Sequence, residues 1–320
     1  MNKIKVSVIV PVYKVERCIE RCVRSLMEQT MKDGIEFIFI NDCTPDNSMI
    51  IIESVVAEYP DRNGQVVIVN NERNLGVFNT RKRGIELAKG EYIGWCDSDD
   101  WCEIDMFEKM CDVAFERALD IVVCNYKLVH DSKISIISLI PSKTPQEAIL
   151  NSYYKRTFRG HLVIHLIKRG IYLRCRNDVV ATNFGEDMFL LFHIYYYSTS
   201  VGYVNTPFYN YWINNKTSLT HSIDWGKSAW LVQQENLERI ERLYYQNNGW
   251  KKFHVTINAL IFERKCLYGK AFDSGKEFFY TFKRASKDIL RFYDWRKLSS
   301  WKMYLCHNYY FLYRLANQPL

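Results

Sequence analysis

The sequence predicts an α/β protein with a mostly parallel, doubly wound sheet and a helical C-terminal appendage. Short β-branched, apolar runs alternate with segments of helical periodicity, and a polar cluster follows each of several runs. This alternation stops near residue 130, after which aromatic and basic residues become frequent. With 48% hydrophobic and 25% charged residues in 320 positions, the composition is globular and excludes a disordered or collagen-like chain.

Five apolar runs are expected to form strands that are buried on both faces, as in a parallel sheet. They span residues 4–12, 35–40, 66–70, 91–96 and 121–126. The intervening helices are expected at 15–29, 46–58, 79–88 and 105–118. Because ligands of such sheets bind at the carboxyl ends of the strands, the polar clusters at 11–16, 41–46, 71–81 and 97–100 should meet at one rim.

The pattern after residue 130 is less regular. We expect an edge or hairpin strand at 134–140, helices at 145–156 and 183–197, and one or two strands within 201–212. From residue 225 the sequence is mostly helical, so we place a boundary near residue 220.

The charge distribution and the cysteine content limit the cellular compartments and protein classes that fit the sequence. Residues 1–130 carry 16 basic and 22 acidic side chains, whereas residues 131–320 carry 27 and 14. The ten cysteines form no CxxC pair, which favours free, buried thiols in a reducing cytoplasm. We expect no signal peptide and no membrane-spanning helix, and the missing GxGxxG and GxxxxGK[ST] motifs argue against a nicotinamide-binding or P-loop protein.

The most distinctive cluster is Asp97-Ser98-Asp99-Asp100, directly after a predicted strand. Two carboxylates at positions i and i+2 of a turn can bind one hard metal ion and leave sites for phosphate oxygens. The alternative is a solvated acidic turn that precedes the next helix. On its own, the cluster leaves both interpretations open.

Two further groups could carry chemistry. Asp42 follows the second strand and could accept a hydrogen bond from a base or ribose, or could simply stabilise the turn. Asp187 follows Glu186 at the start of an apolar helix, where partial desolvation would raise its pKa and suit a general base, although an ordinary helix N-terminal charge explains it equally well.

Taken together, these segments resemble glycosyltransferase family 2, the inverting enzymes with a GT-A nucleotide-diphospho-sugar transferase fold. The resemblance covers roughly residues 4–220 and keeps the order of the family's motifs. The matching segments are Val6–Tyr13, Ile40–Ser48, Asn74–Gly84, Gly90–Asp100 and Gly185–Phe189. It implies a catalytic domain at 1–220, divided into a nucleotide-binding half (1–130) and an acceptor half (131–220), and a helical region at 221–320.

For the donor, the resemblance implies a nucleotide-sugar, most simply a UDP-sugar. Pro11 and Tyr13 would border the base, and Asp42 would bind it. Arg81 would help to hold the nucleotide, and Ser98 would belong to the same binding set.

For the chemistry, the resemblance implies Mn²⁺ or Mg²⁺ held by Asp97 and Asp99, with Asp97 also near the ribose. Asp187 would deprotonate a hydroxyl of a glycan or lipid-linked acceptor in surface-polysaccharide synthesis. His221 could be a further metal or phosphate contact, although a plain loop histidine is the simpler interpretation.

The sequence departs from the family pattern beside these residues. Asn41 and Cys43 replace the usual Asp and Gly, and Lys14 stands where Asn is common. Thr80 and Lys82 replace the usual Ala and Asn around the retained arginine. These changes concern nucleotide preference more than catalysis.

Two alternatives to the transferase remain at this stage. One is a sugar-phosphate nucleotidyltransferase, but residues 13–16 lack the Gly-rich loop of such enzymes. The other is a catalytically silent nucleotide-sugar-binding or scaffold protein, against which the retained Asp99 and Asp187 argue.

The basic, aromatic segment 283–320 is the last feature that the sequence singles out. It predicts either peripheral contact with the cytoplasmic face of the inner membrane or packing of helices on the rest of the chain. Binding of single-stranded nucleic acid needs similar residues but is the least favoured, so we expect no nucleic-acid partner.

Overall fold

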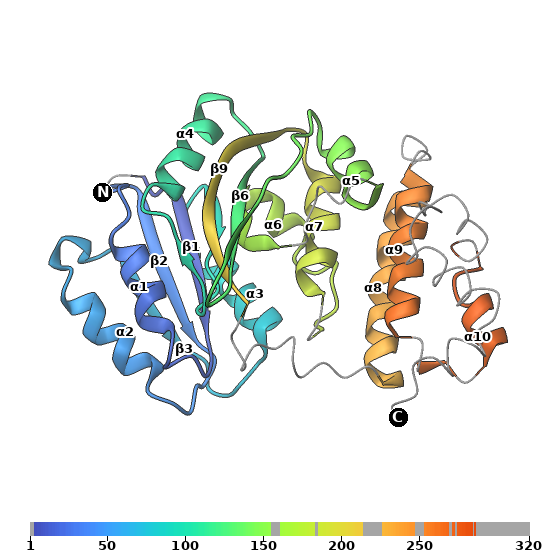
Figure 1. Ribbon diagram of the computed structural model, residues 1–320, viewed down its shortest axis with the longest axis horizontal. Helices are drawn as coiled ribbons and strands as arrows, with labels where there is room; N and C mark the ends of the chain where they lie inside the picture. The colour runs from blue at the N-terminus through green and yellow to red at the C-terminus, as the bar shows by residue number, and fades with distance from the viewer. Residues whose placement is uncertain are drawn as a thin grey trace. The chain divides into compact units, whose positions relative to one another are not determined.

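The computed structural model describes residues 3–154, 161–182, 185–213, 226–246, 253–268, 271–272, 274–283 and 285. The chain divides into two compact units (Figure 1). The first consists of Met1–Ala148 and Arg159–Ser222, and the second of Ile149–Phe158 and Ile223–Leu320. Each unit is described by itself.

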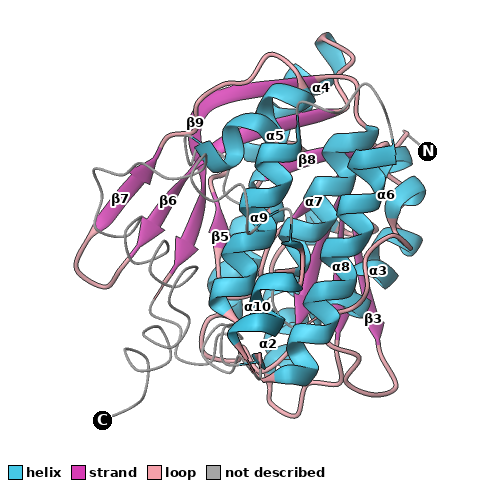
Figure 2. Cartoon of the chain, turned by 90° about the vertical axis from the view of Figure 1, so that its right-hand side faces the viewer, coloured by secondary structure: helices cyan, strands magenta, loops and turns pink. Residues whose placement is uncertain are grey.

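The first unit is built on one mixed sheet. Its described strands are β1 Val6–Val12, β2 Ile35–Asn41, β3 Val66–Asn70, β4 Tyr92–Trp95, β5 Trp101–Cys102, β6 Ile121–Val129, β7 Ile134–Ile137, β8 His165–Lys168 and β9 Val201–Trp212. They are ordered β3-β2-β1-β4-β8-β6-β9-β5, and β7 pairs with β6 at one side (Figure 2).

One half of the sheet is parallel, as the alternation predicts. β1 lies between β2 and β4, and β2 pairs with β3, all in parallel register. β1 and β2 are almost completely buried, as expected for the β-branched and aromatic central strands of a parallel sheet, and α3 contacts both. Four of the five predicted strands thus form the parallel half, and the fifth corresponds to β6, separated from β4 by β8. The expectation that all five are buried on both faces is wrong for β3, which lies at the edge of the sheet and is only partly buried.

The other half of the sheet is mixed, which the sequence did not reveal. β8 lies antiparallel between β4 and β6, and the two-residue β5 pairs antiparallel with β9. Both are short, and β8 leads directly into a helix, so neither carries a periodicity long enough to recognise.

Strand β9 contains an irregularity where it pairs with β6. Cys124 lies opposite Val204, but Tyr126 lies opposite Tyr209, so β9 holds three more residues than β6 between these pairs. Such a bulge bends the strand and changes which face each following side chain occupies.

Helices connect the strands of the first unit. They are α1 Ile19–Met27, α2 Ser48–Ala57, α3 Val77–Leu87, α4 Met106–Glu116, α6 Arg169–Cys175 and α7 Glu186–Tyr197, with short 3₁₀ turns η1 Pro60–Arg62 and η2 Leu162–Ile164; α5 Pro145–Tyr154 spans the division between the units. α1 packs against α2, α3 packs on β1 and β2, and α4 packs on β6, β8 and β9. Helices therefore pack on both the parallel half and the mixed half of the sheet.

The described part of the second unit is helical, in line with the sequence. It contains α8 Lys227–Gln246, α9 His254–Leu267 and α10 Gly275–Tyr280, and α8 packs against α9. Ser274 caps α10, since its hydroxyl oxygen accepts the backbone N–H of Glu277 at 3.1 Å. Within the described residues, no helix is long and apolar enough to cross a bilayer.

Candidate active site

The loops that follow β1, β2, β3 and β4 meet at one rim of the sheet. The backbone N–H of Lys14 donates to the Thr44 hydroxyl at 2.8 Å, which joins the first two loops. The side chain of Asn71, after β3, donates to Asp42, after β2, at 2.8 Å. The convergence expected from the alternation of elements is thus observed.

Asp42 organises the loop that precedes α3. Its carboxylate is buried and accepts the backbone N–H groups of Leu75 and Gly76 at 2.8 and 2.9 Å, in addition to the amide of Asn71. Gly76 caps α3 with a φ of 79°, a left-handed conformation that glycine adopts without strain. Asp42 therefore holds the 74–76 turn in place.

Two family departures lie at strained backbone positions of the same rim. Lys14 has a φ of 54° and Cys43 a φ of 56°. Asn and Gly adopt this left-handed region at lower cost than other residues, which explains physically why those residues are usual here.

The centre of the site is the side chain of Arg81, which α3 carries from its second turn. It is buried, and one terminal nitrogen donates to Asp97 Oδ1 at 2.8 Å. The other donates to Glu186 Oε1 at 2.9 Å and to Asp187 Oδ1. One guanidinium thus joins the acidic turn after β4 to the first turn of α7; we call these four side chains the Arg81 cluster.

The charges in the Arg81 cluster do not balance. One guanidinium faces three carboxylates, so full ionisation would leave an excess of two negative charges. Burial raises the pKa of Asp187 to about 7; Arg81 opposes this shift, and Glu186 and Asp97 reinforce it. The pKa of Glu186 is also raised by burial, although Arg81 opposes that rise. A carboxylate with a pKa near neutrality is suited to exchange a proton.

Residues of β9 hold the acidic turn, Asp97 to Asp100, in place. The hydroxyl of Tyr209 accepts the backbone N–H of Asp97 at 3.0 Å and donates to Asp100 Oδ2 at 2.8 Å. The backbone N–H of Trp212 donates to Asp100 Oδ1 at 2.8 Å. Asp100 is buried, and this desolvation raises its pKa, so its role in the structure is to anchor the turn.

A second arginine reaches the same turn from α1. Arg21 lies over the rings of Trp101 and Trp212, with 3.7 and 5.0 Å between its Cζ and the ring centroids. It also donates to the backbone carbonyl of Asp99 at 3.1 Å. The sequence did not single out Arg21, Tyr209 or Trp212, because their contacts join segments that lie 78 to 112 residues apart.

The remaining predicted donor residues lie along the same rim. Pro11 is half-buried in β1, beyond the last β1–β4 pair at Ile9 and Trp95, and Tyr13 follows β1 with 37% of its surface exposed. Ser98 is buried inside the acidic turn. Pro11, Tyr13 and Ser98 therefore lie at the same rim as Asp42 and Asp97.

Asp97 and Asp99 have the chemistry that a Mn²⁺ or Mg²⁺ ion requires. Both carboxylates are partly exposed on one turn and offer hard oxygen donors. Among the described residues there is no group of three or more His, Cys, Asp or Glu side chains arranged to hold a metal ion. Asp97 and Asp99 thus supply the kind of oxygen donor that such an ion prefers, and in this structure one oxygen of Asp97 accepts a hydrogen bond from Arg81.

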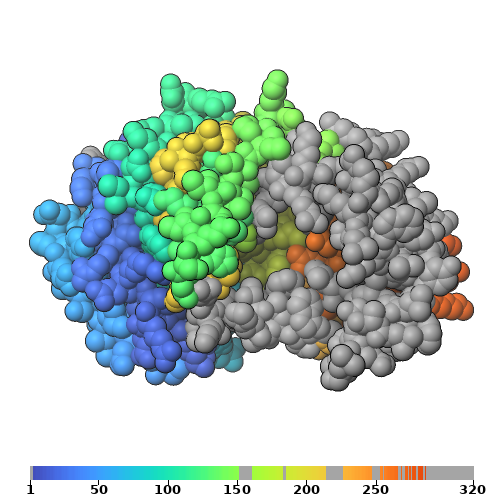
Figure 3. Space-filling model, viewed as in Figure 1, coloured from blue at the N-terminus to red at the C-terminus, as the bar shows by residue number. Residues whose placement is uncertain are grey.

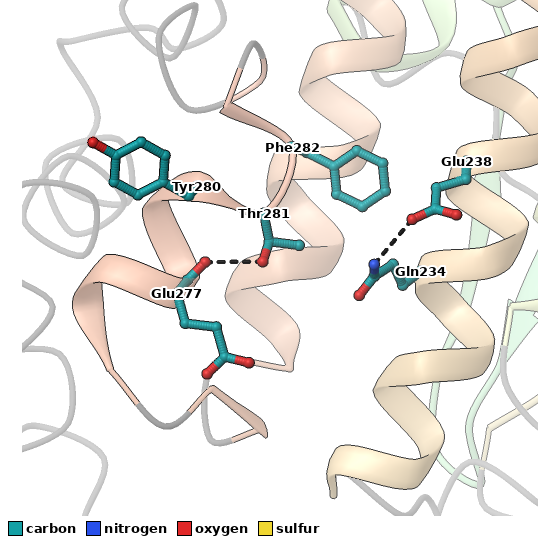
Figure 4. Close-up of a pocket in the computed structure, with 6 residues that line it drawn as sticks. All are labelled: Gln234, Glu238, Glu277, Tyr280, Thr281 and Phe282. Atoms are coloured by element: carbon teal, nitrogen blue, oxygen red, sulfur yellow. Dashed lines mark hydrogen bonds between the residues drawn. The ribbon is translucent and has the colours of Figure 1, made fainter.

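A separate cavity of about 450 Å³ lies in the second unit (Figure 4). Its lining residues are Gln234, Glu238, Glu277, Tyr280, Thr281 and Phe282. None of these is a predicted site residue. His221 lies outside the described residues, as does nearly all of segment 283–320.

The fold of the first unit, a mixed, mostly parallel sheet, is that of the GT-A class, as its likeness to the solved structure of TarS shows. A model of the family "Glycosyl transferase family 2" matches residues 7–174, and the chain belongs to this family.

Known proteins support the family assignment. The chain is 34% identical over 217 residues to the putative glycosyltransferase EpsH of Bacillus subtilis. This match covers 65% of the chain and 61% of EpsH, so the chain spans less than two thirds of the length of that relative. It is 24% identical over 255 residues to the putative teichuronic acid biosynthesis glycosyltransferase TuaG of B. subtilis, covering 80% and 96%. The structure resembles S. aureus TarS 1–349 in complex with UDP-GlcNAc, with a TM-score of 0.64 at 17% identity, covering 95% of this chain and 79% of that one.

Proposed function

We propose that the protein is a metal-dependent inverting glycosyltransferase that moves a sugar from a UDP-sugar to a hydroxyl group of a glycan or lipid-linked acceptor in cell-surface polysaccharide synthesis. The observation that carries the proposal is the Arg81 cluster. The guanidinium of Arg81 joins Asp97, in the turn suited to a metal ion, to Asp187, whose pKa is about 7. The UDP-GlcNAc in the TarS complex supports the donor class, and the name of TuaG supports the acceptor class. The cytoplasm, or the cytoplasmic face of the membrane, is the proposed location.

In the proposed reaction, Asp187 accepts the proton of the acceptor hydroxyl on a carboxylate oxygen. The hydroxyl oxygen forms a bond to the anomeric carbon while the bond from that carbon to the diphosphate oxygen breaks, and attack opposite the leaving group inverts the configuration. A Mn²⁺ or Mg²⁺ ion on Asp97 and Asp99 would neutralise the charge that develops on the leaving diphosphate.

Arg81 connects binding of the donor to the action of Asp187 as the general base. In the structure its guanidinium is shared among three carboxylates, and its Nε is buried without a hydrogen-bond partner in the described part of the chain. A donor diphosphate is a strong ligand for a guanidinium. Donor phosphates would therefore draw Arg81 away from Asp187, which raises the affinity of this carboxylate for a proton and makes it a stronger base.

The first test is calorimetric titration with UDP, GDP, CDP and dTDP, each with Mn²⁺ and with EDTA. Wild type, Asp99→Ala and the control Asp112→Ala, which removes an exposed carboxylate of α4, would be compared. We expect one nucleotide to bind only with Mn²⁺, and this binding to be lost in Asp99→Ala alone. If the folded protein binds none of them, the transferase proposal fails and a scaffold role is favoured.

A second variant separates binding from chemistry. Asp187→Asn should bind the same nucleotide with Mn²⁺ but lose sugar transfer, because the amide cannot accept the proton. Wild-type turnover that consumes a nucleoside triphosphate and a sugar phosphate, with release of pyrophosphate, would instead indicate a nucleotidyltransferase.

A further inference from the structure

One side of α1 follows the segment that leads out of the acidic turn. Arg21 and Ser25 in α1 and Gln29 just after it are spaced four residues apart, so they lie on the same side. The hydroxyl oxygen of Ser25 accepts the backbone N–H of Cys102 at 3.2 Å, and the amide of Gln29 donates to the carbonyl of Glu103 at 2.8 Å. α1 packs against β5, and in Figure 3 the blue N-terminal segments adjoin the green ones at the surface of the first unit. The backbone that follows the acidic turn is therefore fixed by α1.

Arg21 continues this row of contacts into the acidic turn itself. Its terminal nitrogen donates to the backbone carbonyl of Asp99 at 3.1 Å, while its guanidinium lies over the rings of Trp101 and Trp212. The N–H groups of a guanidinium lie in its plane, so a guanidinium stacked on rings can still donate at its edge. The Nε of Arg21 is buried and has no hydrogen-bond partner among the described residues. The two tryptophans, rather than a hydrogen bond at Nε, therefore orient Arg21 toward Asp99.

The two arginines of the site contact the acidic turn in different ways. Arg81 donates to a carboxylate oxygen of Asp97, whereas Arg21 donates to the backbone of Asp99 and forms no ion pair with the turn in the described part of the chain. A guanidinium paired with the Asp99 carboxylate would occupy oxygens that a Mn²⁺ ion needs. Arg21 thus fixes the backbone at Asp99 without covering its carboxylate oxygens.

A metal ligand binds well when the groups behind it hold it in the right orientation. We propose that Arg21 is a positioning residue for the metal ion: held by the two tryptophans, it keeps the Asp99 carboxylate oriented to bind Mn²⁺. This inference rests on the proposed function, in which Asp99 is a metal ligand.

Two effects of Arg21 on the ion oppose each other. Its positive charge repels Mn²⁺, whereas its hydrogen bond orients a ligand of that ion. The charge is screened by water, because the side chain is partly exposed. Loss of a group that orients a metal ligand typically lowers metal affinity by about 10–100-fold. Positioning is therefore the larger effect, and removal of Arg21 weakens Mn²⁺ binding even though it removes a repelling charge.

The test is calorimetric titration with UDP, or with whichever of GDP, CDP and dTDP wild type binds instead, at a series of Mn²⁺ concentrations. Arg21→Met removes the charge and the donor but keeps an apolar stem. We expect the Mn²⁺ concentration for half-maximal nucleotide binding to rise by at least about tenfold, and binding to return at high Mn²⁺. Arg24→Met is the matched control, since Arg24 is one turn further along α1 and pairs with Glu20 and Glu58 instead. It should bind as wild type does.

A second variant tests the stack. Trp212→Leu removes one ring beside Arg21 but keeps the backbone N–H that donates to Asp100. It should also raise the half-saturating Mn²⁺ concentration. The double variant with Arg21→Met should match Arg21→Met alone within about twofold, because both changes act through the same hydrogen bond. Effects that multiply in the double variant would overturn the stack as the cause.

The remaining outcomes separate this inference from the proposed function. Tighter Mn²⁺ binding by Arg21→Met would show that the charge of Arg21 outweighs its position. An unchanged half-saturating concentration with lowered thermal stability would show a purely structural role. Either result overturns the inference and leaves the proposed function standing. If wild type binds none of the four nucleotides with Mn²⁺, the proposed function fails and the inference fails with it.

Discussion

Replacement of Arg81 by Met tests the physical basis of the site. The change keeps the length of the side chain but removes the charge that three carboxylates share. Removing one partner of a buried ion pair costs about 3–5 kcal/mol of unfolding free energy. Since 28% of the Asp97 side chain remains exposed and water can hydrate it, we expect the lower end, about 3 kcal/mol near neutral pH.

The loss should depend on pH. The pKa of Asp187 is already raised to about 7 in the folded protein, so folding takes up a proton and stability falls as pH rises from the unfolded-state pKa through about 7. Without Arg81 the pKa values of Asp187 and Glu186 rise further, since the guanidinium lowers both. The deficit of Arg81→Met should therefore shrink at about pH 5, where the carboxylates take up protons, and be largest above about pH 7.

Urea denaturation followed by circular dichroism at a series of pH values measures this effect. Lys82→Met is the control, because Lys82 is the next residue of α3 and its ammonium donates to the amide oxygen of Asn177 at 3.0 Å rather than to a carboxylate. A deficit below about 1 kcal/mol at every pH, or one that does not change with pH, would refute the reasoning.

Three further predictions follow from the site and its rim. The kcat/KM of sugar transfer should rise about tenfold per pH unit below about 7 and level off above it, because Asp187 must be deprotonated to act as a base; a pH–rate profile without this limb would exclude the role. Cys43→Gly should stabilise the protein by about 1 kcal/mol in thermal unfolding, since the residue has a φ of 56°, and a loss of stability would contradict this. Tyr209→Phe leaves Asp100 and the N–H of Asp97 without the hydroxyl between them, so it should cost about 1–3 kcal/mol and weaken Mn²⁺-dependent nucleotide binding in calorimetry, whereas unchanged binding would show that the turn does not need this anchor.

The sequence was sufficient to predict the parallel half of the fold, because each strand there is a continuous apolar run followed by an amphipathic helix. The strand predicted at 35–40, for example, corresponds to β2, Ile35–Asn41, within one residue. β8 and β5 could not be predicted, since His165–Lys168 and Trp101–Cys102 are too short for a period and are defined by their neighbours in the sheet.

The site could be predicted only in part. Asp97, Arg81 and Asp187 were identified in the sequence, and the structure brings them together. The sharing of one guanidinium among three carboxylates could not be foreseen, because it depends on α3 and α7 meeting across 106 residues of sequence. For the same reason, the hydrogen bonds from Asp42 to the 74–76 turn could not be foreseen, whereas binding of the nucleotide base by Asp42 stays a prediction.

The irregular stretch of β9 limits which insertions and deletions this strand can tolerate. Tyr209 lies opposite Tyr126 only because three additional residues precede it, and a shift of one residue in a strand exchanges the two faces. Deletion of a single residue between Val204 and Tyr209 would direct the phenol away from the acidic turn, while loss of all three would restore the same pairing in a regular strand. Members of the family that use this anchor should therefore differ in the length of this segment by zero or three residues. Its side chains are constrained as well, since Phe208 is buried and Asn205 accepts a hydrogen bond from Asn125. An insertion or deletion there would therefore act on the acidic turn from a strand that carries none of its residues.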